Sequence, residues 1–351
     1  MGWECTLMGG EDIWRGNPVE NRSFQRFPLQ LREYLRANAE QYDVIEYDHE
    51  DLPFPRSEFS PRVLMVARSV LLVHHLARIK IPRPPTVKQT LRQFILGRRD
   101  RIEMEQRIQR SQKTLEQADL INVSNSHDED ELVRSGISDR KVIVMPFGLG
   151  RDRRELFHAV PLEIPHGPPV VAFTGTFDYR KGAREFPAIW ELVRKAVPGV
   201  RLRLLGTSGL MRTEAQVRAC FSPQANESID IYTEFEPDAL PCLLTPCHAG
   251  IFPSYMEGFP NGVLEMLAAA LPVFAYAAPG TSDILAPEFL SPPGNARKLA
   301  TKLIAILTQP NLLAAGRRWA RKRSNDFDWL NVAYQTAQHY KNAYEHQLVC
   351  V

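Results

Sequence analysis

The chain has 351 residues and a formal net charge of +2, with 44% hydrophobic and 24% charged residues. This length favours two domains, and the near-neutral balance argues against a protein that binds nucleic acid through its overall charge. The five cysteines are odd in number and scattered, which excludes a disulfide framework and a cysteine–histidine metal site.

The N-terminal sequence MGWECTLMGGEDIW has no basic start and no apolar run, so we expect no signal peptide. The most apolar stretch, residues 63–77, is interrupted by Arg68, His74 and His75 and is too short and too polar to span a bilayer. We therefore expect a cytoplasmic location, either free or peripheral at the inner face of the membrane.

Short apolar segments rich in Val, Ile and Phe alternate with longer helical segments. In the first half, the predicted strands cover residues 4–9, 42–48, 62–69, 119–125 and 141–148. In the second half, they cover residues 169–177, 200–208, 229–235, 249–254 and 272–278. Near-continuous apolar strands alternating with helices predict parallel sheets covered on both faces. Two such sets predict two doubly wound α/β domains.

A segment rich in glycine, proline and charge, residues 148–169, separates the two sets of strands. We place an N-terminal domain at residues 1–150, a linker at 151–167 and a C-terminal domain at 168–327. The last segment has apolar and aromatic residues at helical spacing. It predicts a long amphipathic helix over about 328–351, whose apolar face must pack on another part of the chain.

Two glutamates, Glu257 and Glu265, stand with seven residues between them at the entrance to an apolar, alanine-rich run. The strand before them is expected to end at Ser254. The motif therefore lies beyond the carboxyl end of a strand, where doubly wound sheets bind their ligands.

The residues between the two glutamates favour a helix start that a ligand can approach. Pro260 suits the first turn of a helix over about 260–270, whose positive N-terminal end is a ready anion site. Gly258 and Gly262 would let a ligand come close to the backbone.

These features together describe the chemistry of a nucleotide sugar. A carboxylate at Glu265 can accept two hydrogen bonds from the vicinal diol of a ribose, and Glu257 can accept from a second polyol. A phosphate would lie at the helix end between them. The alternative is a plain capped helix, with Glu257 solvated and Glu265 in a salt bridge.

The segment EGFPNGVLEMLAAALPV resembles the signature of the family 4 glycosyltransferases, retaining enzymes of the GT-B fold. The resemblance extends over about residues 40–345 and is most specific over 168–285, including VVAFTGTFDYRKGAREFPAIWELV. It implies two Rossmann-like domains facing across a cleft, with the C-terminal helix crossing back to the N-terminal domain. The donor domain would be C-terminal and the acceptor domain N-terminal.

The resemblance also implies roles for individual residues. Lys181 and Glu257 would be the catalytic pair, with Lys181 stabilising the departing diphosphate. Glu265 would hold the ribose, and Phe235 would flank the base, although a core aromatic is an equal alternative for Phe235. The remaining donor-binding residues would be Gly175, Thr176, Arg180, Gly258, Phe259, Pro260, Asn261 and Gly262. Thr176 stands where many relatives carry an arginine, a loss that Arg180 would compensate.

The N-terminal half departs from the family. The resemblance implies that the usual first strand, its Gly-rich loop and the following helix are absent, so that the domain is truncated at its start and apolar surface is uncovered. Directly after Ser69, where relatives often carry a histidine and a glycine, this chain has Val70 and Leu71. The pair His74 and His75 follows, and a structural role is expected for it.

The segment from Arg78 to Arg101 is strongly basic, with eight Lys and Arg residues against Asp100. Its default interpretation is a solvated face. The alternative is a patch on the acceptor domain that approaches anionic lipid or a phosphorylated acceptor, since Leu91, Phe94 and Ile95 interleave with the charges.

The sequence thus predicts transfer of a hexose from a nucleoside diphosphate sugar to a saccharide or lipid-linked acceptor, with retention, in polysaccharide biosynthesis. The mechanism that the resemblance implies needs no metal and no cofactor, and no nucleic-acid partner is expected. The main alternative is a catalytically impaired nucleotide-sugar-binding protein or partner subunit. A GT-B epimerase would need acid–base groups in the N-terminal half, and a dehydrogenase is disfavoured because no GxGxxG follows an early strand.

Overall fold

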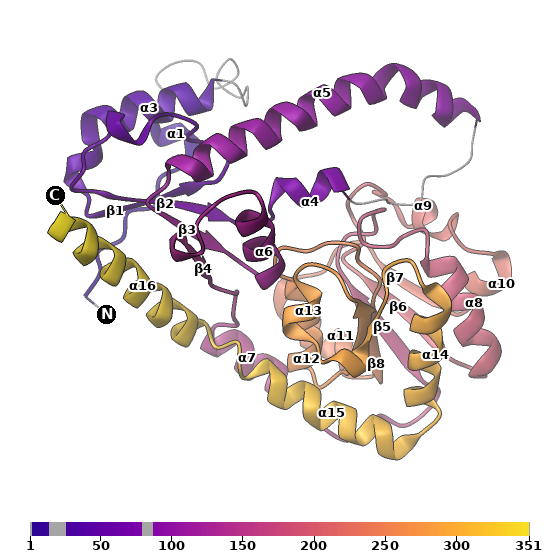
Figure 1. The fold of residues 1–351 in the computed structure, drawn as a ribbon. Helices are drawn as coiled ribbons and strands as arrows, with labels where there is room; N and C mark the ends of the chain where they lie inside the picture. The colour runs from indigo at the N-terminus through magenta and orange to yellow at the C-terminus, as the bar shows by residue number, and fades with distance from the viewer. Residues whose placement is uncertain (1, 14–25, 79–86, 351) are drawn as a thin grey trace. The chain divides into compact units, whose positions relative to one another are not determined.

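The computed structural model describes the backbone of residues 2–13, 26–78 and 87–350, and the side chains of these residues except 76–100 and 350. The described residues cluster into two compact units. Unit 1 consists of those within 2–78, 84–145 and 333–350, and unit 2 of residues 146–332. Each unit contains one parallel sheet with helices packed on it (Figure 1).

The sheet of unit 1 has the order β1-β2-β3-β4, and all its pairs are parallel. Its strands are β1 (Val44–Asp48), β2 (Leu64–Ser69), β3 (Leu120–Val123) and β4 (Val142–Val144). β3 is buried at every position and β2 at all but one. This pattern is typical of parallel strands covered on both faces.

Helices cover both faces of this sheet. They are α1 (Gly10–Ile13), α3 (Phe27–Asn38), α4 (Val73–Arg78), α5 (Val87–Gln117), α6 (Ser126–Arg134) and α16 (Trp329–Cys350), with the short 3-10 turns η1 (Ala39–Gln41), η2 (Arg56–Glu58) and η3 (Asp139–Lys141). On one face, Leu31 and Leu35 of α3 join a core with the strands. On the other, Tyr340 of α16 packs with Leu64, Val66 and Leu120.

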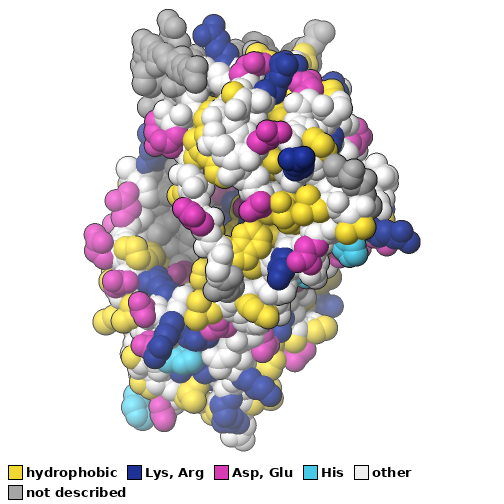
Figure 2. Space-filling model, turned by 90° about the vertical axis from the view of Figure 1, so that its left-hand side faces the viewer, with side chains coloured by type: hydrophobic (Ala, Val, Ile, Leu, Met, Phe, Trp, Pro, Cys, Tyr) yellow, Lys and Arg dark blue, Asp and Glu magenta, His cyan; other side chains and the backbone are white. Residues whose placement is uncertain are grey.

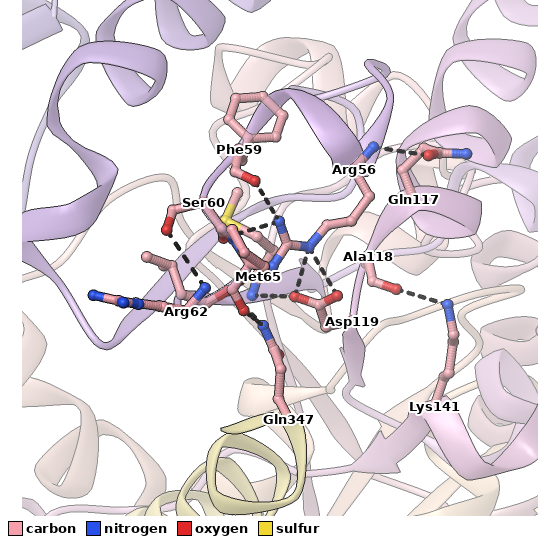
Figure 3. A network of polar contacts seen from close by, with 12 residues as sticks. Arg56, Phe59, Ser60, Arg62, Met65, Gln117, Ala118, Asp119, Lys141 and Gln347 are labelled. Carbon is pink, nitrogen blue, oxygen red and sulfur yellow. Dashed lines mark hydrogen bonds and ion pairs between the residues drawn. The ribbon is translucent and has the colours of Figure 1, made fainter. Parts of the chain in front are cut away.

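A polar network fastens the amino-terminal ends of β2 and β3 (Figure 3). Arg56 Nε donates to both carboxylate oxygens of Asp119, at 2.8 and 2.9 Å, while its other nitrogens donate to backbone carbonyls, including that of Val63 at 2.8 Å. Asp119 also accepts from the backbone N–H of Met65 at 2.9 Å. Gln347 of α16 donates to the same Val63 carbonyl at 3.0 Å. The network thus joins α16 to the sheet.

The strand predicted for residues 4–9 is wrong. Residues 2–9 have no regular secondary structure, and the Leu7 side chain is 99% exposed. A strand exists only where its backbone pairs with a neighbour, and among the described residues β1 pairs with β2 alone. Thr6, Leu7 and Met8 instead line a cavity of about 300 Å³ beside β1.

The sheet of unit 2 has the order β10-β9-β8-β5-β6-β7, again with every pair parallel. Its strands are β5 (Val170–Thr174), β6 (Arg201–Leu205), β7 (Ile229–Tyr232), β8 (Ala249–Phe252), β9 (Val273–Tyr276) and β10 (Leu290–Ser291). β5, β8 and β9 are buried throughout. Both units therefore have the Rossmann-like architecture that the alternating pattern predicts.

The helices of unit 2 are α7 (Arg151–His158), α8 (Phe186–Ala196), α9 (Glu214–Arg218), α10 (Pro223–Asn226), α11 (Leu240–Leu244), α12 (Asn261–Ala268), α13 (Thr281–Ile284), α14 (Ala296–Leu307) and α15 (Pro310–Ser324), with the 3-10 turns η4 (Pro237–Ala239) and η5 (Pro287–Phe289). α7 occupies the segment that we assigned to the linker. Its Phe157 is fully buried in the core of unit 2. Arg317 and Arg321 of α15 donate to backbone carbonyls of residues 157–162 and hold this segment in place.

Every helix in the described part of the chain is too short or too polar to serve as a membrane span. On the face drawn in Figure 2, acidic and basic side chains are interspersed with hydrophobic ones. This mixing agrees with the small formal net charge of +2.

One carboxyl group in unit 1 makes stability depend on pH. Burial, reinforced by repulsion from Asp48, raises the pKa of Asp51 from its ordinary value to about 7. The folded state therefore retains a proton that the unfolded chain has already lost above about pH 4, so stability decreases from there until about pH 7. Asp51→Asn does not have this loss. We therefore expect its free energy of unfolding, relative to that of the parent, to be about 1–2 kcal/mol larger at pH 8 than at pH 5.

Thermal melts at both pH values measure this gain. Asp130→Asn, which alters an exposed carboxylate of α6, is the matched control and should melt in parallel with the parent. Parallel melting of Asp51→Asn with the parent would contradict the prediction.

Candidate functional site

The candidate site of unit 2 lies where the strand order of its sheet reverses. β5 pairs with β6 on one side and with β8 on the other, so the connections after β5 and β8 leave the sheet side by side. Ligands of doubly wound sheets bind at this switch point, beyond the carboxyl ends of the strands. The two connections, residues 175–182 and 253–260, carry most of the residues predicted for the donor site.

The connection after β5 is a tight loop closed over Gly175. The φ of Gly175 is 141°, a conformation that favours glycine. A Cβ added to it would lie 3.6 Å from Lys181 Nζ, so the lysine folds back over the glycine. Asp178 holds the loop by accepting from the Lys181 N–H at 3.0 Å and from the Thr176 hydroxyl at 2.9 Å. The hydroxyl hydrogen of Thr176 is thus used within the loop.

Glu257 is buried, and three polar groups converge on its Oε1 atom. Lys181 Nζ lies at 3.0 Å and Arg180 Nη1 at 3.3 Å, while Ser254 Oγ donates at 2.7 Å. A buried carboxylate is stable only when it is paired and hydrogen-bonded. Sequence analysis selected the glutamate and both cations separately, and the structure brings them together. Ser254 was missed, although it ends the strand that we predicted there.

α12 begins one residue later than predicted, because Pro260 is its N-cap residue and not its first helical residue. The ψ of Pro260 is 77°, which is not helical. Its carbonyl nevertheless accepts from the Val263 and Leu264 N–H groups at 2.9 and 3.1 Å. An N-cap residue needs only its carbonyl in the helix, so its own ψ is free to differ. The helix ends at Ala268 and not near residue 270.

The other motif residues differ in what they offer to a ligand. A Cβ on Gly262 would lie 2.5 Å from the Thr174 carbonyl oxygen, so the close approach at this glycine is made by β5. The Phe259 ring packs 5.9 Å from that of Phe147 in the core of the unit. The side chain of Asn261 is exposed, and Gly258 is buried.

Glu265 lines a cavity of about 510 Å³ together with Phe235. The other lining residues are Arg153, Gly206, Ser208, Thr233, Glu234, Pro237 and Leu240. Arg153 Nη2 lies 2.7 Å from Glu265 Oε1. Burial raises the pKa of Glu265, and Arg153 opposes that rise. Sequence analysis missed Arg153, because it precedes Glu265 by 112 residues in a segment assigned to the linker.

Two buried hydroxyls near the carboxyl ends of β5 and β6 have no hydrogen-bond partner among the described residues. They belong to Thr174, the last residue of β5, and Thr207, two residues after the end of β6. Buried polar groups in native proteins are nearly always paired with protein, water or ligand.

Unit 1 has a separate polar cluster at the carboxyl end of β1. Asp48, His49 and Glu50 have possible ligand atoms within 4.8 Å of one another. The carboxylate of Glu50 already receives Arg107 at 2.6 Å and Arg110 at 3.0 Å, which leaves little room for a cation.

Neither histidine of the predicted structural pair is exposed. His75 Nε2 lies 2.9 Å from Asp128 Oδ1. His74 is 9% exposed, and burial lowers its pKa. Val70 is 48% exposed. Of the basic segment Arg78–Arg101, residues 79–86 and the side chains of residues 87–100 lie outside the described residues.

The sequence of the C-terminal half has recognisable relatives. Residues 168–309 match the family model for glycosyl transferases group 1. Over 178 residues the chain is 25% identical to a glycogen synthase of Mycobacterium tuberculosis, a match that covers 50% of this chain. The chain spans less than half of that relative, since the match covers 42% of its length.

Two solved structures share the fold over most of the chain. Sucrose-phosphate synthase from Thermosynechococcus elongatus superposes with a TM-score of 0.68 at 22% identity, covering 94% of this chain and 82% of that one. Anabaena HepE in complex with UDP and glucose gives a TM-score of 0.61 at 16% identity, covering 92% and 84%. The fold of the chain is therefore GT-B, and its residues 168–309 are similar to the glycosyl transferases group 1 family.

Proposed function

We propose that the chain is a glycosyltransferase that moves a hexose from a nucleoside diphosphate sugar to a saccharide or lipid-linked acceptor, with retention of anomeric configuration. The observation that carries the proposal is the meeting of Lys181, Arg180 and Ser254 on buried Glu257 at the switch point. Eight residues further along, Glu265 lines a cavity of about 510 Å³.

The geometry suits a donor that is anionic at its centre and polyhydroxylated at both ends. Lys181 and Arg180 would turn from Glu257 to the diphosphate and stabilise the charge that develops as the sugar departs. Glu257 would then accept from hydroxyls of the transferred sugar, and Glu265 from the ribose. The cavity that contains Phe235 would take the base. Neither the carboxylates nor the cations need a metal in this scheme.

The acceptor would bind unit 1. The basic Arg78–Arg101 segment would bring the protein to an anionic membrane surface at the cytoplasmic side. A catalytically impaired nucleotide-sugar-binding protein remains the second candidate. Its motivation is that Thr176, whose hydroxyl donates to Asp178 within its own loop, stands where the resembled family often carries an arginine.

Isothermal titration with UDP, GDP and their sugars tests the donor site. We expect at least one of them to bind, and Glu265→Ala to weaken that binding by about 10–100-fold, the loss of one or two hydrogen bonds to a charged group. The control is Glu214→Ala, which removes an exposed glutamate of α9 from the same unit. Binding of none of these compounds by the parent would refute the donor site.

Transfer assays separate the two candidates. Hydrolysis or transfer of the bound donor, detected by NMR with the anomeric configuration of the product, is expected for the enzyme and should persist in a chelator. Binding without turnover under any acceptor condition would favour the impaired protein.

A further inference from the structure

The guanidinium group of Arg153 is held in place by several contacts. Its guanidinium carbon lies 4.9 Å from the centre of the Phe157 ring. Nη1 donates to the Pro237 carbonyl at 2.6 Å and lies 3.4 Å from Asp238 Oδ1, while Nη2 donates to Glu265 Oε1 at 2.7 Å. The side chain is 22% exposed, so the pair is largely shielded from solvent.

The helix that carries Arg153 is itself anchored at two residues that follow Arg153. Phe157, one turn further along, is fully buried in the core of the unit. The next residue, Arg154, forms a close ion pair with Asp328. Because the helix is fixed, only the Arg153 side chain has to be ordered, and its planar guanidinium loses less entropy per hydrogen bond than a more flexible group would.

The ion pair leaves Glu265 with one oxygen committed and one available. Arg153 contacts Oε1, and the carboxylate lines the cavity. The charged groups around it are Arg153 from α7, Asp238 from η4 and Glu234 from the segment after β7. Arg153 is the one cation among these three groups, so it alone favours the ionised carboxylate.

We propose that Arg153 is a positioning residue that fixes the Glu265 carboxylate, so that its second oxygen accepts from the 2′-hydroxyl of a bound nucleotide. The inference rests on the proposed donor site and adds its selectivity. A ribonucleotide gains a hydrogen bond to a charged acceptor that a 2′-deoxyribonucleotide cannot make. Such a bond contributes about 1.5–3 kcal/mol, which corresponds to about 10–100-fold in affinity.

Titration calorimetry of the full chain with UDP, GDP and their 2′-deoxy counterparts tests this at pH 8 and pH 6. The parent should prefer the ribonucleotide by about tenfold or more at both pH values. Arg153→Gln should reduce that preference to about threefold or less at pH 6. Without the guanidinium, the buried carboxylate protonates at a higher pH, so the preference should recover partly at pH 8.

Two further variants make the result specific. Arg153→Lys keeps the charge and should restore a ribose preference that does not vary with pH. Glu265→Gln keeps only a neutral acceptor and should reduce the preference to about threefold or less at both pH values. Adding Arg153→Gln to it should cost nothing more, because the two residues act through one contact. If Arg153→Gln does not fold, Arg153→Met, which also removes the charge and keeps the apolar stem, replaces it in the same comparison.

The outcomes are distinct. An Arg153→Gln protein that keeps the parent's preference at both pH values overturns the inference while leaving the donor site intact. Equal loss of affinity for ribo- and deoxyribonucleotides, without pH dependence, shows a merely structural role and also overturns it. A parent chain that binds no nucleotide refutes the donor site itself, and the inference falls with it.

Discussion

Replacing Lys181 with methionine is expected to lower the rate of sugar transfer by about 10²–10³-fold, the loss typical when one preorganised group that stabilises developing charge is removed. The ammonium lies 3.0 Å from Glu257 and 3.6 Å from the position that a Cβ on Gly175 would occupy. It is therefore held at the loop where we place the departing diphosphate. Methionine keeps most of the apolar stem and removes only the charge.

Steady-state kinetics should place this loss mainly in kcat. Glu257 retains Arg180 at 3.3 Å and Ser254 at 2.7 Å, so the variant should remain folded. Lys195→Met, which changes an exposed lysine of α8, is the matched control and should retain the parent rate. A Lys181→Met protein that keeps its rate within about threefold would remove Lys181 from the mechanism.

Gly262→Ala is the second change with a large expected effect. The added Cβ would lie 2.5 Å from the Thr174 carbonyl oxygen, closer than such atoms approach, and this oxygen belongs to the backbone of β5 and not to a flexible side chain. α12 must therefore shift away from the sheet and carry Glu265 with it. We expect a cost of about 1–3 kcal/mol in stability and a loss of about tenfold or more in nucleotide affinity.

Gly150→Ala is the control for this substitution, since a Cβ at Gly150 meets nothing within 4 Å. Thermal melts and nucleotide titrations of both variants give the comparison. If Gly262→Ala melts with the parent and binds as tightly, the contact between α12 and β5 is softer than its geometry indicates.

The sequence identified those candidate site residues that lie in the loops directly after predicted strands. Glu257, Lys181 and Arg180 each follow directly after a predicted strand, and the carboxyl ends of adjacent parallel strands bring them together. Arg153 could not be found in this way. Its contact with Glu265 joins residues 112 apart and depends on a helix in a segment whose glycines and prolines indicated a linker.

The sequence pattern also gave a wrong prediction where a strand-like segment has no neighbouring strand to pair with. Residues 4–9 have strand-like composition, but β propensity describes fit to a sheet surface and does not supply a neighbouring strand. Gly262 was predicted to leave space for a ligand, but the atom that uses this space is the Thr174 carbonyl oxygen. A sequence shows that space is needed at a glycine, while only the packed structure shows which atoms use it.

α16 makes the completion of unit 1 depend on the synthesis of unit 2. Its first residues belong to unit 2, and its later ones cover Leu64, Val66 and Leu120 in unit 1. A fragment ended at Met145 would expose these side chains to water, at a cost of about 1.5–3 kcal/mol for each that had been fully buried. The core of unit 1 is therefore completed only by the last segment of the chain, so its folding cannot finish before unit 2 has been synthesised.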